Sequence, residues 1–201
     1  RAVKITDVSA KTFVYKTNQM KDSDGHSHPG PRRDSKMSLF TITCDDGTQG
    51  HTIVSPRDAR KELLDGYVKP VLIGADPMRT EQLWYALYKW QRGSGFALDD
   101  RTLCTVDLAL WDLVGKITKQ PVWKLLGGYR NRMPTYIAGG YYEQGKGLRE
   151  LAKEMTDNVE MGARAIKMKI GAVPIREDVE RVRIVREAIG PDVKLLVDAN
   201  C

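Results

Sequence analysis

The first part of the chain alternates apolar and polar positions in a way that predicts a small antiparallel sheet. Residues 2–16 and residues 37–44 have this alternation, and each predicts a strand. The sequence Asp45-Asp46-Gly47 is typical of a turn, so residues 49–54 are predicted to return as a hairpin partner. Between the first two strands, residues 17–36 are polar and contain Gly and Pro, which predicts a long loop.

Helical spacing replaces the alternation after residue 54. Ser55-Pro56 and Asp76-Pro77 are helix-start sequences, because a capping side chain precedes a proline in each. Residues 102–116 are apolar on most of the circumference of a helix, which predicts a buried helix. A short helix over residues 121–126 should end at Gly127-Gly128.

Strands and helices alternate after Gly128. We predict strands over residues 133–138, 165–170 and 193–197, separated by helices over residues 148–161 and 174–189. This βαβαβ order is typical of a parallel sheet with right-handed crossovers. Because three parallel strands cannot close a barrel, we expect the sequence to be a fragment of a longer chain.

Composition excludes several classes of protein. The 201 residues are 41% hydrophobic and 29% charged, without an apolar run of membrane-spanning length, so we expect a soluble protein without a membrane partner. No signal-peptide core occurs near the start, and the sparse cysteines Cys44, Cys104 and Cys201 fit inert thiols in a reducing cytoplasm. The net charge of +6 comes from bases that alternate with acids, which is typical of solvated helix faces and not of nucleic-acid binding.

The first candidate chemistry is the pair Lys167 and Lys169 on a predicted strand. Side chains alternate along a strand, so both lysines point to one side and Met168 to the other. Burial and mutual repulsion would lower the pKa of each lysine and make a neutral amine base possible near neutral pH. From spacing alone, however, two surface lysines on an edge strand are the favoured interpretation.

The second candidate is Asp198, which follows the next predicted strand. A carboxylate at the carboxyl end of a strand can bind Mg²⁺, a cation that prefers oxygen ligands. Taken alone, Asp198 is more simply a cap or turn residue. Together with the lysines on the neighbouring strand, it predicts a site that removes a proton alpha to a metal-bound carboxylate.

Two long motifs add a family resemblance. The stretch from Asp107 to Lys116 and the stretch from Pro121 to Gly128 resemble the signature of the mandelate racemase/muconate lactonizing group of the enolase superfamily. The pair Lys167 and Lys169 and the D-A-N sequence at 198–200 match this group at the expected distances. The resemblance implies an α+β capping domain over residues 1–128, followed over residues 129–201 by the first three strands of a (β/α)8-type barrel.

The resemblance also implies roles for individual residues. Lys169 would be the base that acts on the alpha proton, and Lys167 its companion near the substrate carboxylate. Asp198 would be the first Mg²⁺ ligand, and Asn200 would lie near the substrate. The other two metal carboxylates and a His–Asp pair would come from later strands, beyond Cys201.

Specificity in this family comes partly from two loops of the capping domain, here about residues 17–36 and 48–57. The first loop contains Lys21, His26 and Arg32, which could meet an anionic, polyhydroxy substrate or could simply be solvated. The second contains His51 at a place where many family members have an aromatic residue followed by an acid, so His51 could contact the substrate. Tyr141, just past the first barrel strand, could line the pocket or pack in the core.

The leading functional prediction is an Mg²⁺-dependent dehydratase of acid sugars, either aldonates or aldarates. A racemase or epimerase with the same enediolate intermediate comes second, a cycloisomerase third, and a non-catalytic structural relative represents a different class. No dinucleotide or phosphate-binding glycine motif occurs, so a nucleotide cofactor is not expected. The resemblance implies a homo-oligomer, and the predicted helices contain aromatic residues for a core or a subunit interface: Trp84, Tyr85, Tyr88, Trp90 and Trp111.

Overall fold

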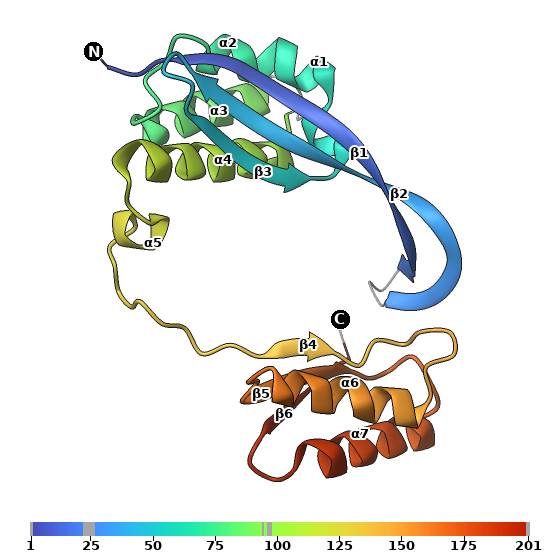
Figure 1. The fold of residues 1–201 in the computed structure, drawn as a ribbon. Coiled ribbons are helices and arrows are strands. Elements are labelled where there is room, and N and C mark those ends of the chain that lie inside the picture. The colour runs from blue at the N-terminus through green and yellow to red at the C-terminus, as the bar shows by residue number, and fades with distance from the viewer. Residues whose placement is uncertain (1, 22–26, 94, 96–97, 200–201) are drawn as a thin grey trace. The chain divides into compact units, whose positions relative to one another are not determined.

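The computed structural model describes residues 2–21, 27–93, 95 and 98–199, and for residues 19, 21 and 27–30 it describes only the backbone (Figure 1). The chain forms two compact units. The first contains Arg1–Tyr15 and Asp34–Asn131, and the second contains Lys16–Arg33 and Arg132–Cys201. Each unit is described by itself below. The domain boundary expected between residues 128 and 129 stays a prediction.

Three strands form the first sheet in the order β1-β2-β3: β1 (Ile5–Lys21), β2 (Ser27–Cys44) and β3 (Gln49–Val54). Strands β2 and β3 are antiparallel, with Ile42 opposite Gly50. The turn between them closes where the Gly47 N–H donates to the Cys44 carbonyl at 3.0 Å. Gly47 has a φ of +83°, which an L side chain rarely adopts. The predicted hairpin is therefore confirmed.

The predicted loop over residues 17–36 is wrong for the residues that the structure describes. Strand β1 continues to Lys21 and β2 begins at Ser27, so both arms of this segment are strands. Side chains at positions 31–34 are exposed. A paired ribbon satisfies its backbone hydrogen bonds between strands and needs no apolar face to do so, so hydropathy gives no signal of it.

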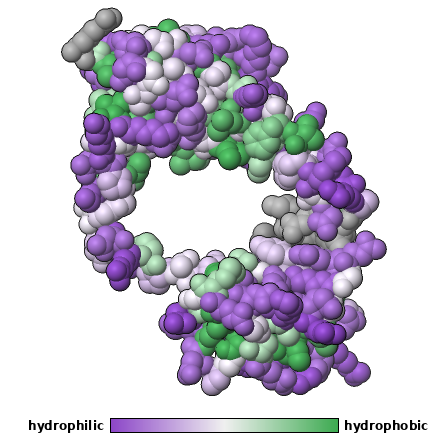
Figure 2. All heavy atoms as spheres, in the orientation of Figure 1, coloured by the Kyte–Doolittle hydropathy of each residue, from purple (hydrophilic) through white to green (hydrophobic). Residues whose placement is uncertain are grey.

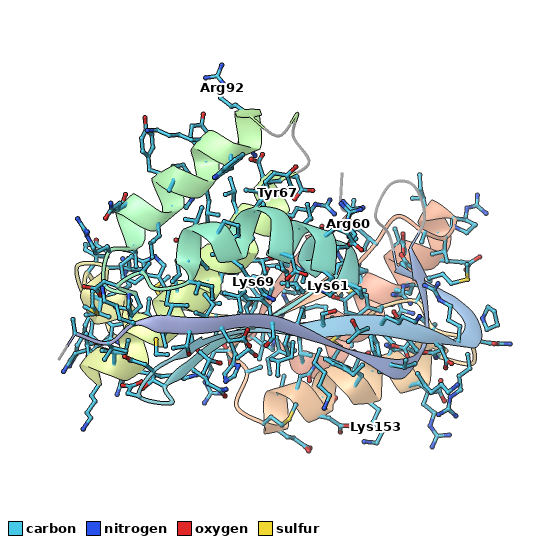
Figure 3. All side chains as sticks on the ribbon, turned by 90° about the horizontal axis from the view of Figure 1, so that it is seen from above. Arg60, Lys61, Tyr67, Lys69, Arg92 and Lys153 are labelled. Carbon is cyan, nitrogen blue, oxygen red and sulfur yellow. The ribbon has the colours of Figure 1, made fainter. Side chains whose placement is uncertain are left out.

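Helices follow the sheet in the first unit. They are a 3₁₀ turn η1 (Pro56–Ala59), α1 (Lys61–Leu63), a π-helical turn η2 (Leu64–Val68), α2 (Lys69–Leu72), α3 (Thr80–Gly93), α4 (Asp100–Thr118) and α5 (Val122–Leu125). Pro70 has no N–H and therefore cannot donate the helical hydrogen bond to the carbonyl four residues earlier. This helps to explain the π-helical turn η2 that precedes it. Along this segment Asp65 pairs with Lys61 and Lys69, both labelled in Figure 3.

The core of the first unit lies between the sheet and α4. Fully buried side chains come from both, including Phe40, Ile42, Leu110 and Leu113. Gly50 allows β3 to approach α4 closely, because a Cβ at this position would lie 2.6 Å from the Leu113 Cβ. At the start of α4, Asp99 Oδ1 accepts a hydrogen bond from the Thr102 N–H at 2.9 Å and caps the helix. The predicted buried helix over residues 102–116 is confirmed.

The aromatic side chains of α3 are not core residues. Trp84, Tyr85, Tyr88 and Trp90 are all exposed by a third or more of their surface, and Trp84 stacks on Tyr88 with ring centroids 5.2 Å apart. The core interpretation is therefore wrong for these four, and the subunit-interface alternative stays a prediction. Figure 2 shows that hydrophilic residues cover most of the visible surface of each unit, with hydrophobic residues between them.

The second unit has a parallel sheet in the order β4-β5-β6: β4 (Ile137–Gly139), β5 (Ala165–Lys169) and β6 (Lys194–Asp198). The connections contain α6 (Leu148–Glu160) and α7 (Ile175–Ile189), which lie together beside the sheet (Figure 1). The predicted βαβαβ order is confirmed, although β4 is shorter than expected. The core of the second unit is formed by Ile166 and Met168 of β5 together with side chains of both helices: Leu151, Met155, Val185 and Ile189.

No helix among the described residues combines the length and the apolar composition that a membrane span requires.

Candidate active site

The candidate site lies on β5 and β6, at the carboxyl end of the parallel sheet. Ile166 and Met168 are fully buried against the helices, so Lys167 and Lys169 lie on the opposite face of β5, as the alternation predicted. Lys169 is the register partner of Asp198, the last residue of β6. Parallel pairing therefore brings Asp198 next to two lysines that lie about 30 residues earlier in the sequence.

Both lysines donate to the same oxygen. The Lys167 Nζ lies 2.7 Å and the Lys169 Nζ 2.6 Å from Asp198 Oδ2. The exposed fractions of the three side chains are 20%, 13% and 26%, so the cluster is only partly open to solvent. Hydrogen bonds between charged partners are among the strongest in proteins. The interpretation as two surface lysines on an edge strand is therefore wrong, because β5 is the central strand of this sheet and both side chains are largely buried.

The electrostatics of Lys167 differ from the expectation. The hydrogen bond to Asp198 raises the pKa of the Lys167 ammonium, and this effect exceeds the opposing effect of burial. The expectation that repulsion and burial would lower the pKa is therefore wrong for Lys167 in this structure. The reason is that the negative charge of Asp198 stabilises the charged form of the Lys167 side chain.

Two tyrosine rings flank the lysines. The Tyr141 ring centroid lies 6.0 Å from the Lys169 Nζ, and the Tyr136 ring centroid lies 5.4 Å from the Lys167 Nζ. The structure thus places Tyr141, a predicted pocket residue, beside the candidate base. Tyr136 was not predicted, although strand alternation offered a signal: it shares a face with Ala138, and Ala138 is the register partner of Lys167.

His51 lies on β3 in the first unit. Its Nδ1 is 3.0 Å from Thr41 Oγ1, and its backbone N–H donates to Asp112 Oδ2 at 2.8 Å. Lys116 also bonds Asp112 Oδ2, at 2.6 Å. Lys116 Nζ also donates to the Gln49 carbonyl of β3 at 2.9 Å, so Asp112 and Lys116 both fasten β3 to α4.

The remaining predicted residues are less informative. Arg32 lies on β2 with an exposed side chain. Lys21 ends β1, but its side chain is outside what the structure describes. His26 and Asn200 both lie outside the described residues.

Asp198 fits one part of a magnesium site. Its carboxylate offers the hard oxygen that Mg²⁺ prefers, and it stands at a strand end beside partly buried amines. Over the described ranges, no group of three or more His, Cys, Asp or Glu side chains could hold a metal ion. Asp198 could therefore supply one ligand, and further ligands would have to come from elsewhere.

Comparison with known proteins gives matches along most of the chain. Residues 11–127 match the model of the mandelate racemase/muconate lactonizing enzyme N-terminal domain, and residues 149–201 match that of the enolase C-terminal domain-like family. An arabinonate dehydratase of Saccharolobus solfataricus is 42% identical over 148 residues, covering 71% of this chain and 39% of that protein. An L-Ala-D/L-Glu epimerase of Clostridium acetobutylicum is 33% identical over 137 residues, covering 68% of this chain and 36% of that protein.

A solved structure has a similar fold. The crystal structure of D-glucarate dehydratase from Agrobacterium tumefaciens, complexed with magnesium, superposes with a TM-score of 0.76 at 37% identity. The match covers 97% of this chain and 53% of the other. The chain thus spans about half of that enzyme and about two fifths of the two curated relatives.

Proposed function

The chain belongs to the mandelate racemase/muconate lactonizing enzyme family of the enolase superfamily, and we propose that it carries one side of the active site of an Mg²⁺-dependent acid-sugar dehydratase. The observation that carries the proposal is the convergence of Lys167 and Lys169 on one oxygen of Asp198, at the ends of adjacent parallel strands. Carboxyl ends of strands are where barrel enzymes hold their catalytic groups.

In the proposed reaction, the Lys169 amine accepts the proton alpha to the substrate carboxylate. The Lys167 ammonium, held between Asp198 and the Tyr136 ring, provides positive charge for the substrate carboxylate. Tyr141 forms a wall of the pocket next to Lys169. Loss of the beta-hydroxyl group then completes dehydration, assisted by an acid from the rest of the protein.

Asp198 is the residue of this chain that would hold Mg²⁺. The bound cation would supply the positive charge that stabilises the enediolate form of the substrate. The magnesium complex of a D-glucarate dehydratase with 37% identity supports this part of the proposal.

The substrate class rests on the relatives. An arabinonate dehydratase and a D-glucarate dehydratase act on acid sugars by their names, and the chain resembles both over most of its own length. We therefore propose a small polyhydroxy carboxylate, an aldonate or aldarate, as the substrate.

The test is a screen of the complete protein against aldonates and aldarates with and without Mg²⁺. We expect a 2-keto-3-deoxy product from at least one of them, formed only with Mg²⁺ and lost in the Lys169→Met variant. If no sugar acid gives such a product, dehydration is contradicted.

Racemisation or epimerisation is the second candidate, favoured by the 33% identity to an epimerase. Both reactions begin with removal of the same alpha proton. In D₂O, an epimerase would place deuterium on the alpha carbon and invert it without loss of water. A dehydratase would release water, so product mass separates the two.

A further inference from the structure

Arg181 of α7 is a charged side chain buried beneath the ends of two strands. It is only 8% exposed. One guanidinium nitrogen, Nη2, donates to the Gly140 carbonyl at 2.7 Å and lies 3.5 Å from the Lys169 carbonyl. Gly140 directly follows β4, and Lys169 ends β5. A single side chain thus reaches the backbone at the carboxyl ends of both strands.

Asp178, one turn earlier on α7, completes the cluster. Its Oδ1 accepts a hydrogen bond from the Tyr142 hydroxyl at 2.7 Å and lies 3.4 Å from the Arg181 Nε. Its Oδ2 accepts the Gly171 N–H at 2.6 Å. The Tyr142 ring lies against the guanidinium, with 4.1 Å from the ring centroid to the Arg181 Cζ. The cluster therefore ties both strand–helix loops to α7.

The position of this cluster is what connects it with the candidate site. The segments that it holds are Gly140 to Tyr142 and Lys169 to Gly171. Two residues of the candidate site, Tyr141 and Lys169, belong to these segments, and the Lys169 Nζ lies 6.0 Å from the Tyr141 ring centroid. A buried ion pair is a poor source of stability compared with apolar packing, so its presence under a catalytic loop calls for another reason.

Gly140 increases the need for such an anchor. It has a φ of +64°, and a Cβ there would lie 2.8 Å from the Met168 Cβ. Glycine at this position allows the loop to cross close to β5, but glycine also leaves the backbone with more conformational freedom. The hydrogen bond from Arg181 to the Gly140 carbonyl restricts that freedom.

We propose that Arg181, together with Asp178 and Tyr142, is a positioning group that fixes the backbone from which Lys169 and Tyr141 reach the substrate. It does not touch the reacting atoms, and its effect on catalysis rests on the proposed function. A displacement of about 1 Å in a catalytic group can lower a rate by roughly a hundredfold.

The catalytic test compares variants of the complete protein with a matched control on the same helix. Arg183 is exposed and pairs with Glu180 and Glu187, so Arg183→Met removes an arginine of α7 that lies outside the cluster. We expect Arg181→Lys and Tyr142→Phe to lower kcat by about tenfold or more with little change in KM. Arg181→Met should be worse than Arg181→Lys, and Arg183→Met should behave like the wild type.

The structural test does not depend on any activity. Hydrogen–deuterium exchange, followed by mass spectrometry of peptides over residues 137–147 and 164–172, reports the mobility of the two anchored segments. We expect faster exchange there in Arg181→Lys and Tyr142→Phe, with no change in the first unit and none in Arg183→Met. Tyr142→Phe keeps the ring and loses only the hydroxyl. The exchange measurement can therefore be made on this variant even if the Arg181 variants do not fold.

The outcomes separate this proposal from the proposed function. Faster local exchange in a protein that acts on no sugar acid supports the positioning group and contradicts the dehydratase. Normal exchange and normal kcat in both Arg181→Lys and Tyr142→Phe would overturn the positioning group. The positioning group would also be overturned if the loss of kcat in each variant equalled its loss of folded protein.

Discussion

Lys169 and Asp198 are register partners on adjacent parallel strands, and the lysine Nζ lies 2.6 Å from the Asp198 Oδ2. The same oxygen accepts a hydrogen bond from the Lys167 Nζ at 2.7 Å. Two amines and one carboxylate thus form a single ion-pair network at a strand end. Replacement of any one of them changes the electrostatic environment of the other two.

Replacement of the candidate base should remove proton abstraction without unfolding the protein. For Lys169→Met we expect kcat to fall by roughly a hundred- to ten-thousand-fold, because the side chain keeps its length but cannot accept a proton. Release of the alpha tritium or deuterium label to solvent measures this step directly.

The control for that variant is Lys153→Met. Lys153 projects outward from α6, is 74% exposed and pairs with Asp157 (Figure 3). Its loss should leave the rate unchanged. Label release at the wild-type rate from Lys169→Met would exclude Lys169 as the base.

Asp198→Asn should weaken magnesium binding. The amide keeps the shape of the side chain but loses the negative charge that a hard cation requires, so affinity should fall by more than about tenfold. Titration calorimetry with Mg²⁺ on the complete protein measures this. Asp157→Asn removes an exposed carboxylate of α6 and should bind Mg²⁺ as the wild type does, whereas equal affinities in all three proteins would argue against Asp198 as a ligand.

Gly50→Ala should destabilise the first unit. A methyl group at this position would meet the Ala109 carbonyl oxygen and would lie 2.6 Å from the Leu113 Cβ, so β3 and α4 would have to separate. Overpacking of this kind costs about 1–3 kcal/mol. Urea unfolding measures the change in free energy.

Gly66→Ala is the matched substitution for that measurement. Gly66 is exposed on the π-helical turn η2, and a Cβ there would have no neighbour within 4 Å. We expect no loss of stability from Gly66→Ala. An equal loss in both variants would show that the contact of Gly50 with α4 is unimportant.

The Cys44 thiol should make stability fall at alkaline pH. Burial, followed by the nearby Asp46, raises the pKa of this thiol from 9.0 to about 11 in the folded state. Its contribution is fully present below pH 9 and is lost as the pH rises towards 11, because the unfolded chain releases the proton first. A difference of this size between the folded and unfolded pKa is worth about 3 kcal/mol. In Cys44→Ala, the free energy of unfolding measured with urea should fall less steeply between pH 8 and 11 than in the wild type. The same dependence on pH in both proteins would contradict the raised pKa of Cys44.

The strand and helix order of the barrel portion could be predicted from sequence because its segments are buried on one side. The alternation of Ile166 and Met168 with Lys167 and Lys169 already separated the core face from the site face. The arms of β1 and β2 near residues 17–36 could not be predicted, because exposed paired strands satisfy their backbone without an apolar pattern.

The amino-acid sequence was enough to predict that two lysines share one face of a strand and that an acid follows the next strand. The three-dimensional structure was needed to show that both amines contact one oxygen of Asp198, that the pKa of Lys167 rises, and that Arg181 lies beneath the strand ends. Periodicity in a sequence indicates only which side of an element is buried. Distances between side chains depend on strand register and helix packing, which join residues far apart in the chain.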